Sequence, residues 1–248
     1  MENPFTTYSL WAGLFGGLAL FLFGMDVMTH ALKSAAGDYI KDILARMTSN
    51  RLLGMMTGAF VTAVIQSSSV TTVLMVGFIS AGLMTMAQSV AVIIGANIGT
   101  TITAQILAFK VTALALPMIA GGFLVSFTVK SEHWKQAGSI VLGLGLVFYG
   151  MALMSDALYP LRSFPPFIEF MISMKNPLMG AAVGAGFTAI VQSSSATTGI
   201  LIVMASQGLI GLETAIAIAM GANVGTCVTA GLASIGKPRE AQRAALVH

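Results

Sequence analysis

The tetrapeptide Gln-Ser-Ser-Ser occurs twice in this chain, at residues 66–69 and 192–195, and both copies lie inside long apolar stretches. The copies are 126 residues apart (192 − 66 = 126), and the same displacement carries Asn97 to Asn223. It also carries Gly24, Gly54, Thr62 and Gly95 to Gly150, Gly180, Thr188 and Gly221. Self-similarity at one fixed displacement indicates an internal repeat. The chain is therefore predicted to consist of two tandem copies of one unit.

The apolar stretches around the tetrapeptides indicate a membrane environment. Of 248 residues, 56% are hydrophobic and only 8% are charged, and the mean hydropathy is +0.88. No acidic, basic or histidine residue occurs from Leu52 to Phe109, and Glu213 is the only one from Asn176 to Gly236. Such runs are typical of helices that cross a bilayer. We therefore predict an all-α integral membrane protein, multi-pass in the cell membrane.

Charge and cysteine content exclude two other kinds of protein. The formal net charge of +3 comes from a few lysines and arginines in short connecting segments, so there is no basic face for nucleic acid. Cys227 is the only cysteine, so neither a disulfide framework nor a cysteine-rich metal site can form within the chain. The expected partners are the lipid bilayer and small solutes, with no nucleic acid.

Five apolar runs are long enough to cross the bilayer, which takes roughly 20 residues. They are residues 8–32, 86–109, 111–129, 138–158 and 214–235. Two further stretches, 52–83 and 178–210, are too long for one upright helix, and the tetrapeptides interrupt them. A limb such as 52–65 would reach only about 21 Å at about 1.5 Å per residue, against a hydrocarbon core of roughly 30 Å. We therefore predict two re-entrant helical hairpins with their tips near the midplane.

Each copy is predicted to hold three crossings and one hairpin that returns to its own side. An odd number of crossings leaves the second copy inverted relative to the first. Repeat 1 is residues 1–129, with the hairpin 52–83 and a broken helix at 86–109. Repeat 2 is residues 130–248, with the hairpin 178–210 and a broken helix at 214–235. Its last helix is expected to be truncated, because 111–129 maps beyond His248.

The basic residues predict which side faces the cytoplasm. One side carries Lys33, Lys41, Arg46, Arg51, Lys130, Lys135, Lys237, Arg239 and Arg243. The other side carries Lys110, Arg162 and Lys175. By the positive-inside rule the richer side is cytoplasmic, so the first hairpin would open from the cytoplasm and the second from outside. An amphipathic surface helix is also expected over residues 33–51.

The tetrapeptides are suited to binding an anion. Serine is among the best helix N-caps, so the three serines are well placed to begin the second limb of each hairpin. The unpaired N–H groups and the positive end of the helix dipole would then face the tip, which is a ready anion site. Because the motif segments lack charged residues, a cation held nearby would reduce the cost of placing an anion in a low dielectric.

Side-chain oxygens near each tip are suited to an alkali cation. Glutamine carbonyls and serine and threonine hydroxyls are hard oxygen ligands, and Thr62 and Thr188 lie four residues before each glutamine. Residues 95–101 and 221–227 each add two glycines and an asparagine, a combination expected to unwind a spanning helix. Sodium coupling follows as a hypothesis, with sodium as the only metal expected.

An enzyme is the alternative from a different class. An intramembrane serine hydrolase needs a base beside its nucleophile. His30, His133 and His248 all lie outside the motif segments, and the chain has no Gly-x-Ser-x-Gly. We therefore predict that the chain is not an enzyme. A regulatory membrane subunit that transports nothing itself stays open as an alternative.

The doubled Gln-Ser-Ser-Ser, followed in each copy by Gly-Ala-Asn-x-Gly-Thr, resembles the type II sodium/phosphate cotransporter family, including its bacterial members. The similarity runs over essentially the whole chain. It implies sodium-coupled import of inorganic phosphate by alternating access, with sodium ions for coupling and no other cofactor. The alternatives are a sodium-coupled carrier of carboxylates or other oxyanions and the regulatory subunit.

The chemistry and the resemblance together assign the candidate site residues. The phosphate-binding set is Gln66, Ser67, Ser68, Ser69, Gln192, Ser193, Ser194 and Ser195. The sodium-binding set is Gln66, Thr62, Asn97, Thr100, Gln192, Thr188, Asn223 and Thr226. Cys227 stands where the first copy has Thr101, so a hydroxyl at that position is not symmetric. Many bacterial relatives look longer, and a homodimer and a PhoU-like domain or protein stay open as partners.

Overall fold

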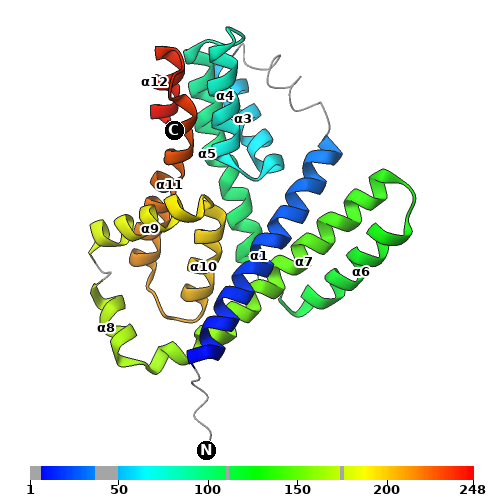
Figure 1. The fold of residues 1–248 in the computed structure, drawn as a ribbon, viewed down its shortest axis with the longest axis vertical. Coiled ribbons are helices and arrows are strands. Elements are labelled where there is room, and N and C mark those ends of the chain that lie inside the picture. The colour runs from blue at the N-terminus through cyan, green and yellow to red at the C-terminus, as the bar shows by residue number, and fades with distance from the viewer. Residues whose placement is uncertain (1–6, 37–49, 110–111, 174–175) are drawn as a thin grey trace, which may run out of the picture. The chain divides into compact units, whose positions relative to one another are not determined.

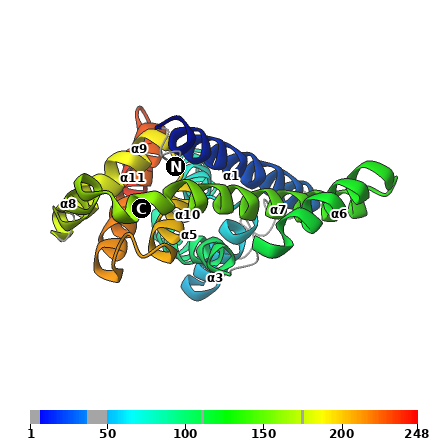
Figure 2. The same cartoon turned by 90° about the horizontal axis from the view of Figure 1, so that it is seen from below.

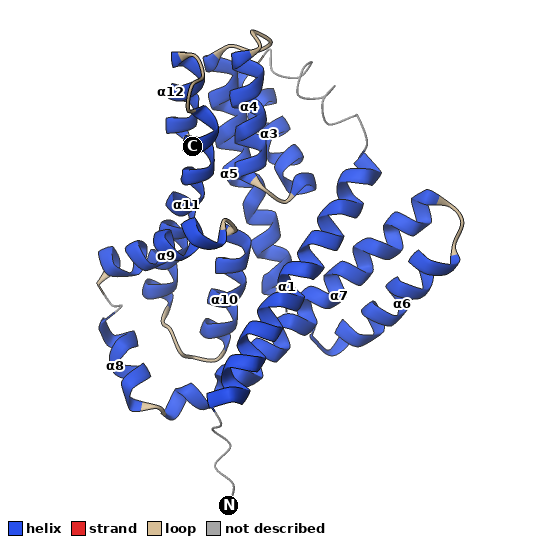
Figure 3. Cartoon of the chain, in the orientation of Figure 1, coloured by secondary structure: helices blue, strands red, loops and turns tan. Residues whose placement is uncertain are grey.

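The computed structural model describes residues 7–36, 50–109, 112–173 and 176–248, and every regular element in these ranges is a helix (Figure 3). This confirms the all-α class. The chain divides into two compact units. Unit 1 comprises Met1–Ala31 and Leu107–Asn223, and unit 2 comprises Leu32–Ile106 and Val224–His248. The surface helix expected over residues 33–51 lies largely outside the described residues.

Four of the described helices are long and apolar enough to cross a membrane. They are α1 (Thr7–Ala36), α5 (Met86–Ala108), α7 (Glu132–Leu158) and α11 (Leu212–Ser234). Even the shortest, at 23 residues, is about 35 Å long, which exceeds a hydrocarbon core of roughly 30 Å. The chain is therefore a multi-pass membrane protein.

The fifth expected crossing is shorter than the sequence indicates. Within residues 112–129 the chain forms a 3₁₀ turn, η1 (Thr112–Leu114), and then α6 (Ala115–Thr128). The 14 residues of α6 give about 21 Å of helix, less than the roughly 30 Å core. Pro117 lies in the first turn of α6, where its missing N–H removes no helical hydrogen bond. A regular helix therefore begins only just before this proline.

Each stretch that contains a tetrapeptide is a pair of helices with a sharp break between them. The first pair is α3 (Arg51–Ile65) and α4 (Ser68–Ser80), and the second is α9 (Pro177–Val191) and α10 (Ser194–Ser206). All four boundaries recur after 126 residues, as do those of α5 and α11. The displacement of 126 residues found in the sequence therefore also separates these helix boundaries. The re-entrant path and the inversion of the copies stay predictions.

In unit 1 the helices pack through glycines. α1 lies alongside α7 (Figure 1), and a Cβ on Gly24 would lie 2.6 Å from the Gly143 carbonyl oxygen. α6 packs on the N-terminal half of α7 (Figure 2). There, a Cβ on Gly138 would lie 2.7 Å from the Ser126 nitrogen. Small residues let helix backbones approach closely in a bilayer. The chain of unit 1 continues through η2 (Tyr159–Ser163) and α8 (Pro165–Ser173).

The prediction that α5 and α11 are broken at their Gly-Ala-Asn segments is wrong. Both are continuous helices, because the glycines serve helix contacts instead of unwinding the chain. A Cβ on Gly95 would overlap the Met55 carbonyl oxygen of α3, and one on Gly221 would overlap the Ala181 carbonyl oxygen of α9. Each spanning helix therefore lies directly against the first limb of its own helix pair.

α12 (Arg239–Val247) completes unit 2 and packs against α4 (Figure 1). Its alanines are almost fully buried and join one apolar cluster with side chains of α4. The alanines are Ala241, Ala244 and Ala245, and the α4 side chains are Met75, Val76 and Ile79. The second limb of the first helix pair is thus held on one side by α12.

Replacing Gly95 by alanine tests the close contact between α3 and α5. Gly95→Ala is expected to cost about 1–3 kcal/mol of stability, because the added methyl must displace backbone. Gly77→Ala is the matched control, since a Cβ there meets nothing within 4 Å and alanine favours a helix by up to about 1 kcal/mol. Thermal unfolding of the purified protein in detergent measures both. Equal unfolding temperatures for the two variants would contradict the contact.

Candidate functional site

Gln66 ends α3 in a conformation that few residues other than glycine adopt. Its φ of 60° and ψ of 24° are left-handed, and in the described chain only Gln66 and Gln192 are non-glycine residues with positive φ. The Gln66 N–H donates to the Thr62 carbonyl oxygen at 2.7 Å and closes the last turn. The left-handed conformation costs roughly 1–2 kcal/mol for an L-residue. Contacts around Gln66 must therefore hold it there.

The side-chain amide of Gln66 makes two of the contacts that stabilise this left-handed conformation. Its Nε2 donates to the Ala63 carbonyl oxygen within α3, and its Oε1 accepts from Thr103 Oγ1 of α5 at 2.7 Å. Gln66 is 8% exposed and Thr103 is 2% exposed. An amide oxygen has two lone pairs, so Oε1 keeps one for a further partner while the bond to Thr103 fixes the break against α5.

Ser67 follows as the N-cap of α4. It is extended, with φ −153° and ψ 110°, and its Oγ accepts from the Val70 N–H at 3.3 Å. The first N–H groups of a helix have no intrahelical acceptor. Those of Ser68 and Ser69 find none elsewhere in the described chain. Two unpaired amides and the positive end of the helix dipole therefore meet at the break.

Two buried threonines join the limbs next to the break. Thr62 Oγ1 of α3 and Thr71 Oγ1 of α4 are 2.8 Å apart, and both side chains are fully buried. Thr71 Oγ1 also donates to the Ser67 carbonyl oxygen at 3.2 Å. Because a hydroxyl has only one proton, Thr62 is the donor within the pair. The lone pairs of Thr62 Oγ1 are thus left to accept or to coordinate.

The second break repeats this geometry. Gln192 has φ 58° and ψ 23°, and its N–H donates to the Thr188 carbonyl oxygen at 2.7 Å. Ser193 Oγ accepts from the Ala196 N–H at 3.2 Å. The Oγ1 atoms of Thr188 and Thr197 are 2.6 Å apart. The copies differ in exposure: Gln192 is exposed and Ser194 is half-buried, whereas Gln66 and Ser68 are buried. The first break belongs to unit 2 and the second to unit 1.

The other predicted residues of the first copy lie on α5. Gly99 packs against Ala59 and Thr62, so the α5 motif lies against α3 close to the break. Asn97 is exposed, and Thr100 is half-buried with its Oγ1 donating to the Ala96 carbonyl oxygen at 2.9 Å. The structure thus brings the α5 motif next to Thr62.

The matching residues of the second copy lie on α11. Asn223 is exposed and Thr226 is 4% exposed. Asn223 is the last residue of the unit 1 segment, and Thr226 belongs to unit 2. In unit 1, Gly221 of the same motif packs against Ala181 of α9. The α11 motif therefore begins against the first limb of its own pair, as the α5 motif does.

Thr103 is a site residue that the sequence reasoning misses. It lies one helical turn after Gly99 on the face of α5 that contacts α3, and it is the donor that fixes Gln66. The signal was present in the sequence, because the displacement of 126 carries Thr103 to Thr229. Extending the Gly-Ala-Asn motif by one turn would have found it.

Each break therefore offers groups for an anion beside groups for a cation. The anion groups are backbone N–H donors at a helix N-terminus. The cation groups are neutral glutamine and threonine oxygens, which suit hard cations. No cluster of three or more His, Cys, Asp or Glu side chains occurs in the described ranges. The motif segments of the first copy carry no charge at all, so the local field comes from dipoles.

Substituting Gln66 tests the left-handed break. Gln66→Gly and Gln66→Ala remove the same amide, but glycine adopts positive φ without a Cβ penalty. The glycine variant is therefore expected to be more stable than the alanine variant by about 1 kcal/mol. Thermal unfolding of the two proteins, with the same pair at Gln192, measures the difference. An alanine variant as stable as the glycine variant would show that the backbone is not left-handed there.

Substituting Thr103 tests the bond that holds Gln66. Thr103→Val keeps the shape but leaves a buried amide oxygen without its donor, at an expected cost of about 1–3 kcal/mol. Thr103→Ser keeps the hydroxyl and is expected to lose less than about 1 kcal/mol for the missing methyl. Unfolding temperatures compare the variants with the parent. Valine and serine variants of equal stability would count against the bond.

A family model described as Na⁺/Pi-cotransporter matches residues 20–156 and 168–244, which include every candidate site residue. "Uncharacterized protein YqeW" of Bacillus subtilis is 31% identical over 232 residues, 93% of this chain and 75% of that protein. "Putative inorganic phosphate export protein YjbB" of Escherichia coli is 28% identical over 234 residues, 94% of this chain but only 43% of that protein.

A mammalian protein is similar over a shorter part. The rat "Sodium-dependent phosphate transport protein 2A" is 36% identical over 97 residues, 38% of this chain and 15% of that protein. No solved structure matches. The resemblance carried by the two Gln-Ser-Ser-Ser tetrapeptides is confirmed, because the family model covers most of the chain and both motifs. This chain belongs to the Na⁺/Pi-cotransporter family.

Proposed function

We propose that this chain carries inorganic phosphate across the cell membrane with sodium as the coupling ion, in the direction of import. Membership of the Na⁺/Pi-cotransporter family supports phosphate as the substrate. The observation that carries the proposal is the pair of matching helix breaks, each with a capped helix N-terminus inside an apolar stretch. Because a symporter moves substrate with its ion, an inward sodium gradient drives phosphate inward.

Phosphate binds at the helix N-termini in this proposal. The N–H groups of Ser68 and Ser69, and of Ser194 and Ser195, donate to phosphate oxygens, and the serine hydroxyls add further donors. The Ser68 hydroxyl is well suited to this role, since it makes no side-chain hydrogen bond within the described ranges and Ser68 is 6% exposed. Gln66 and Gln192 stand before the serines and contribute their amides.

Sodium compensates the charge of the bound anion. An anion held by dipoles alone in a low dielectric is costly, and a cation within a few ångströms lowers that cost. The proposed sodium ligands are neutral oxygens on Thr62, Gln66, Asn97 and Thr100, and on Thr188, Gln192, Asn223 and Thr226. Thr62 Oγ1 supports this role most directly, because its proton is used in the bond to Thr71 and its lone pairs are not.

Transport follows by alternating access. Two inverted copies, each with a hairpin that opens from its own side, give the protein two related conformations of opposite access. Sodium binds first, makes the cavity favourable for phosphate, and the loaded site then opens to the other side. The export stated in the name of the Escherichia coli relative applies to that protein. The same sites would serve either direction of flux.

Flux of labelled phosphate into proteoliposomes tests the function. With the full chain reconstituted, an inward sodium gradient is expected to drive uptake, and a potassium gradient of the same size is not. Ser68→Ala and Ser194→Ala each remove a donor to a charged ligand, worth about 1.5–3 kcal/mol, so KM for phosphate is expected to rise at least about tenfold.

Ser80→Ala is the matched control for the serine variants. Ser80 ends α4 at the far end from the break, and its Oγ only donates to the Val76 carbonyl oxygen of its own helix. It is expected to leave uptake unchanged. Reconstituted protein with no sodium-dependent phosphate flux in either direction would reject the proposal. Competition by citrate or succinate with no effect of arsenate would favour a carboxylate carrier instead.

A further inference from the structure

α12 has one face buried in the protein and the opposite face open. At 100° per residue, Ala241, Ala244 and Ala245 share one side of the helix, and all three are at most 4% exposed. They pack on Met75, Val76 and Ile79 in the second half of α4. This packing fixes which side of α12 faces outward.

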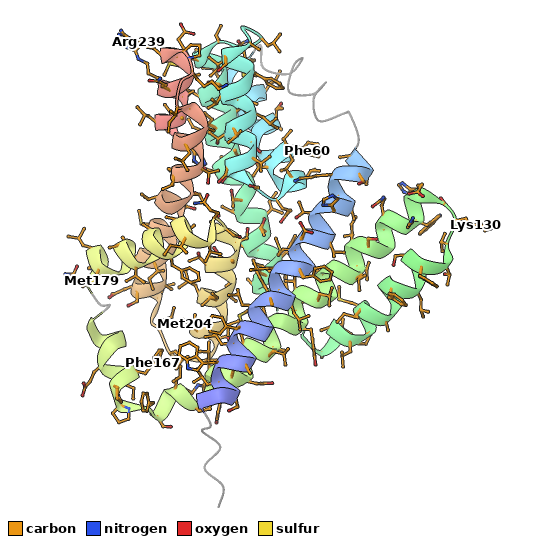
Figure 4. All side chains as sticks on the ribbon, in the orientation of Figure 1. Phe60, Lys130, Phe167, Met179, Met204 and Arg239 are labelled. Carbon is orange, nitrogen blue, oxygen red and sulfur yellow. The ribbon has the colours of Figure 1, made fainter. Side chains whose placement is uncertain are left out.

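The outward face carries two arginines and an exposed leucine. Arg239, Arg243 and Leu246 lie opposite the alanines on the helix, and all three are exposed, Leu246 to 86%. Figure 4 labels Arg239 at the outer edge of α12. No ion pair of either arginine occurs within the part of the chain that the structure describes. The face therefore presents two arginines next to an apolar side chain, with the exposed carboxylate of Glu240 at its edge.

The position of α12 relative to the end of α11 sets its depth in the membrane. α11 is long and apolar enough to cross the bilayer and ends at Ser234. Gly236, with φ 73°, and the Lys237 N–H bond to the Ser234 carbonyl oxygen turn the chain sharply before Pro238 caps α12. Since only four residues separate the helices, α12 begins where the spanning helix leaves the hydrocarbon core.

We propose that the Arg239–Arg243–Leu246 face of α12 docks on the headgroups of anionic phospholipids. The charge complementarity is direct, since arginine guanidinium groups bind phosphate oxygens bidentately. Leu246 lies one turn further along the same face, where its side chain reaches the acyl boundary as in other interfacial amphipathic helices. Lys237, just before the helix, is exposed and adds a third cation.

The same geometry links the lipid to the first helix break. The alanine face of α12 holds the half of α4 that leads back to Ser67. A headgroup bound to the arginines thus fixes α12 and, through it, one limb of the first pair. The cytoplasmic leaflet is the anionic one, and the positive-inside rule assigns Lys237, Arg239 and Arg243 to that side.

Quenching by brominated lipids tests the docking without any transport assay. A fluorophore is attached to Gln242→Cys on the edge of the outward face, in a Cys227→Thr background so that one thiol remains. The protein is placed in nanodiscs of phosphatidylcholine and phosphatidylglycerol in equal parts, with bromine on one lipid at a time. Brominated phosphatidylglycerol is expected to quench several-fold more than brominated phosphatidylcholine.

The arginines are then varied with charge removed or kept. Each cation near an anionic surface raises the affinity for an anionic lipid over a neutral one by roughly fivefold. Replacing both arginines, as Arg239→Gln with Arg243→Gln, is therefore expected to lower this affinity ratio by about 25-fold. Arg239→Lys with Arg243→Lys keeps the charge and is expected to keep most of the preference. Both pairs change exposed side chains only, so the fold is retained.

Three results would overturn the proposal. Equal quenching by the two lipids in the parent protein would show no selection for anionic headgroups. A preference that is undiminished in the glutamine pair would place the lipid elsewhere, since only the smaller contribution of Lys237 should remain. Absence of quenching by either lipid would show that the face does not touch the bilayer and would favour a protein partner. Phosphate flux is not needed for any of these readings, so they stand whatever the transport assay shows.

Discussion

The left-handed glutamine at each helix break is the constraint on which the candidate site depends. A non-glycine residue with positive φ persists only where its surroundings hold it, and here the hold is specific. The Gln66 amide bonds to Ala63 and to Thr103, while Thr62 and Thr71 join the limbs on either side. The turn then delivers Ser67 in the extended conformation of an N-cap. The geometry of the proposed anion-binding end of α4 is thus a consequence of where Gln66 is held.

Close helix contacts supply the rigid support for this turn. Gly95 and Gly99 let α5 lie directly on α3, and the same helix face then presents Thr103 to Gln66. On the other side, the alanines of α12 cover the outer half of α4. Because small residues permit such approach without bulky side chains between the helices, a polar break of only a few residues can be kept in one geometry inside an apolar segment.

Much of this could be predicted from the sequence, and the failures have physical causes. The repeat, the membrane class and the position of both breaks follow from Gln66, Gln192 and the charge-free runs, because polar residues in apolar stretches are rare. The Gly-Ala-Asn segments are predicted from the sequence to unwind, since glycine weakens a helix, but tertiary contact at Gly95 and Gly221 overrides propensity. Thr103 recurs as Thr229 at the displacement of 126, but its role depends on a partner 37 residues away, so the repeat marks the position without revealing what it contacts.

Equilibrium binding of labelled phosphate to the purified protein, in sodium and in potassium at equal ionic strength, tests the central claim most directly. If dipoles alone hold the anion too weakly and sodium compensates its charge, phosphate should bind at least about tenfold more tightly in sodium than in potassium. A factor of this size is within the usual range of coupling between two ligands. By linkage, phosphate should raise sodium affinity by the same factor. Phosphate that binds equally well in potassium would contradict the account.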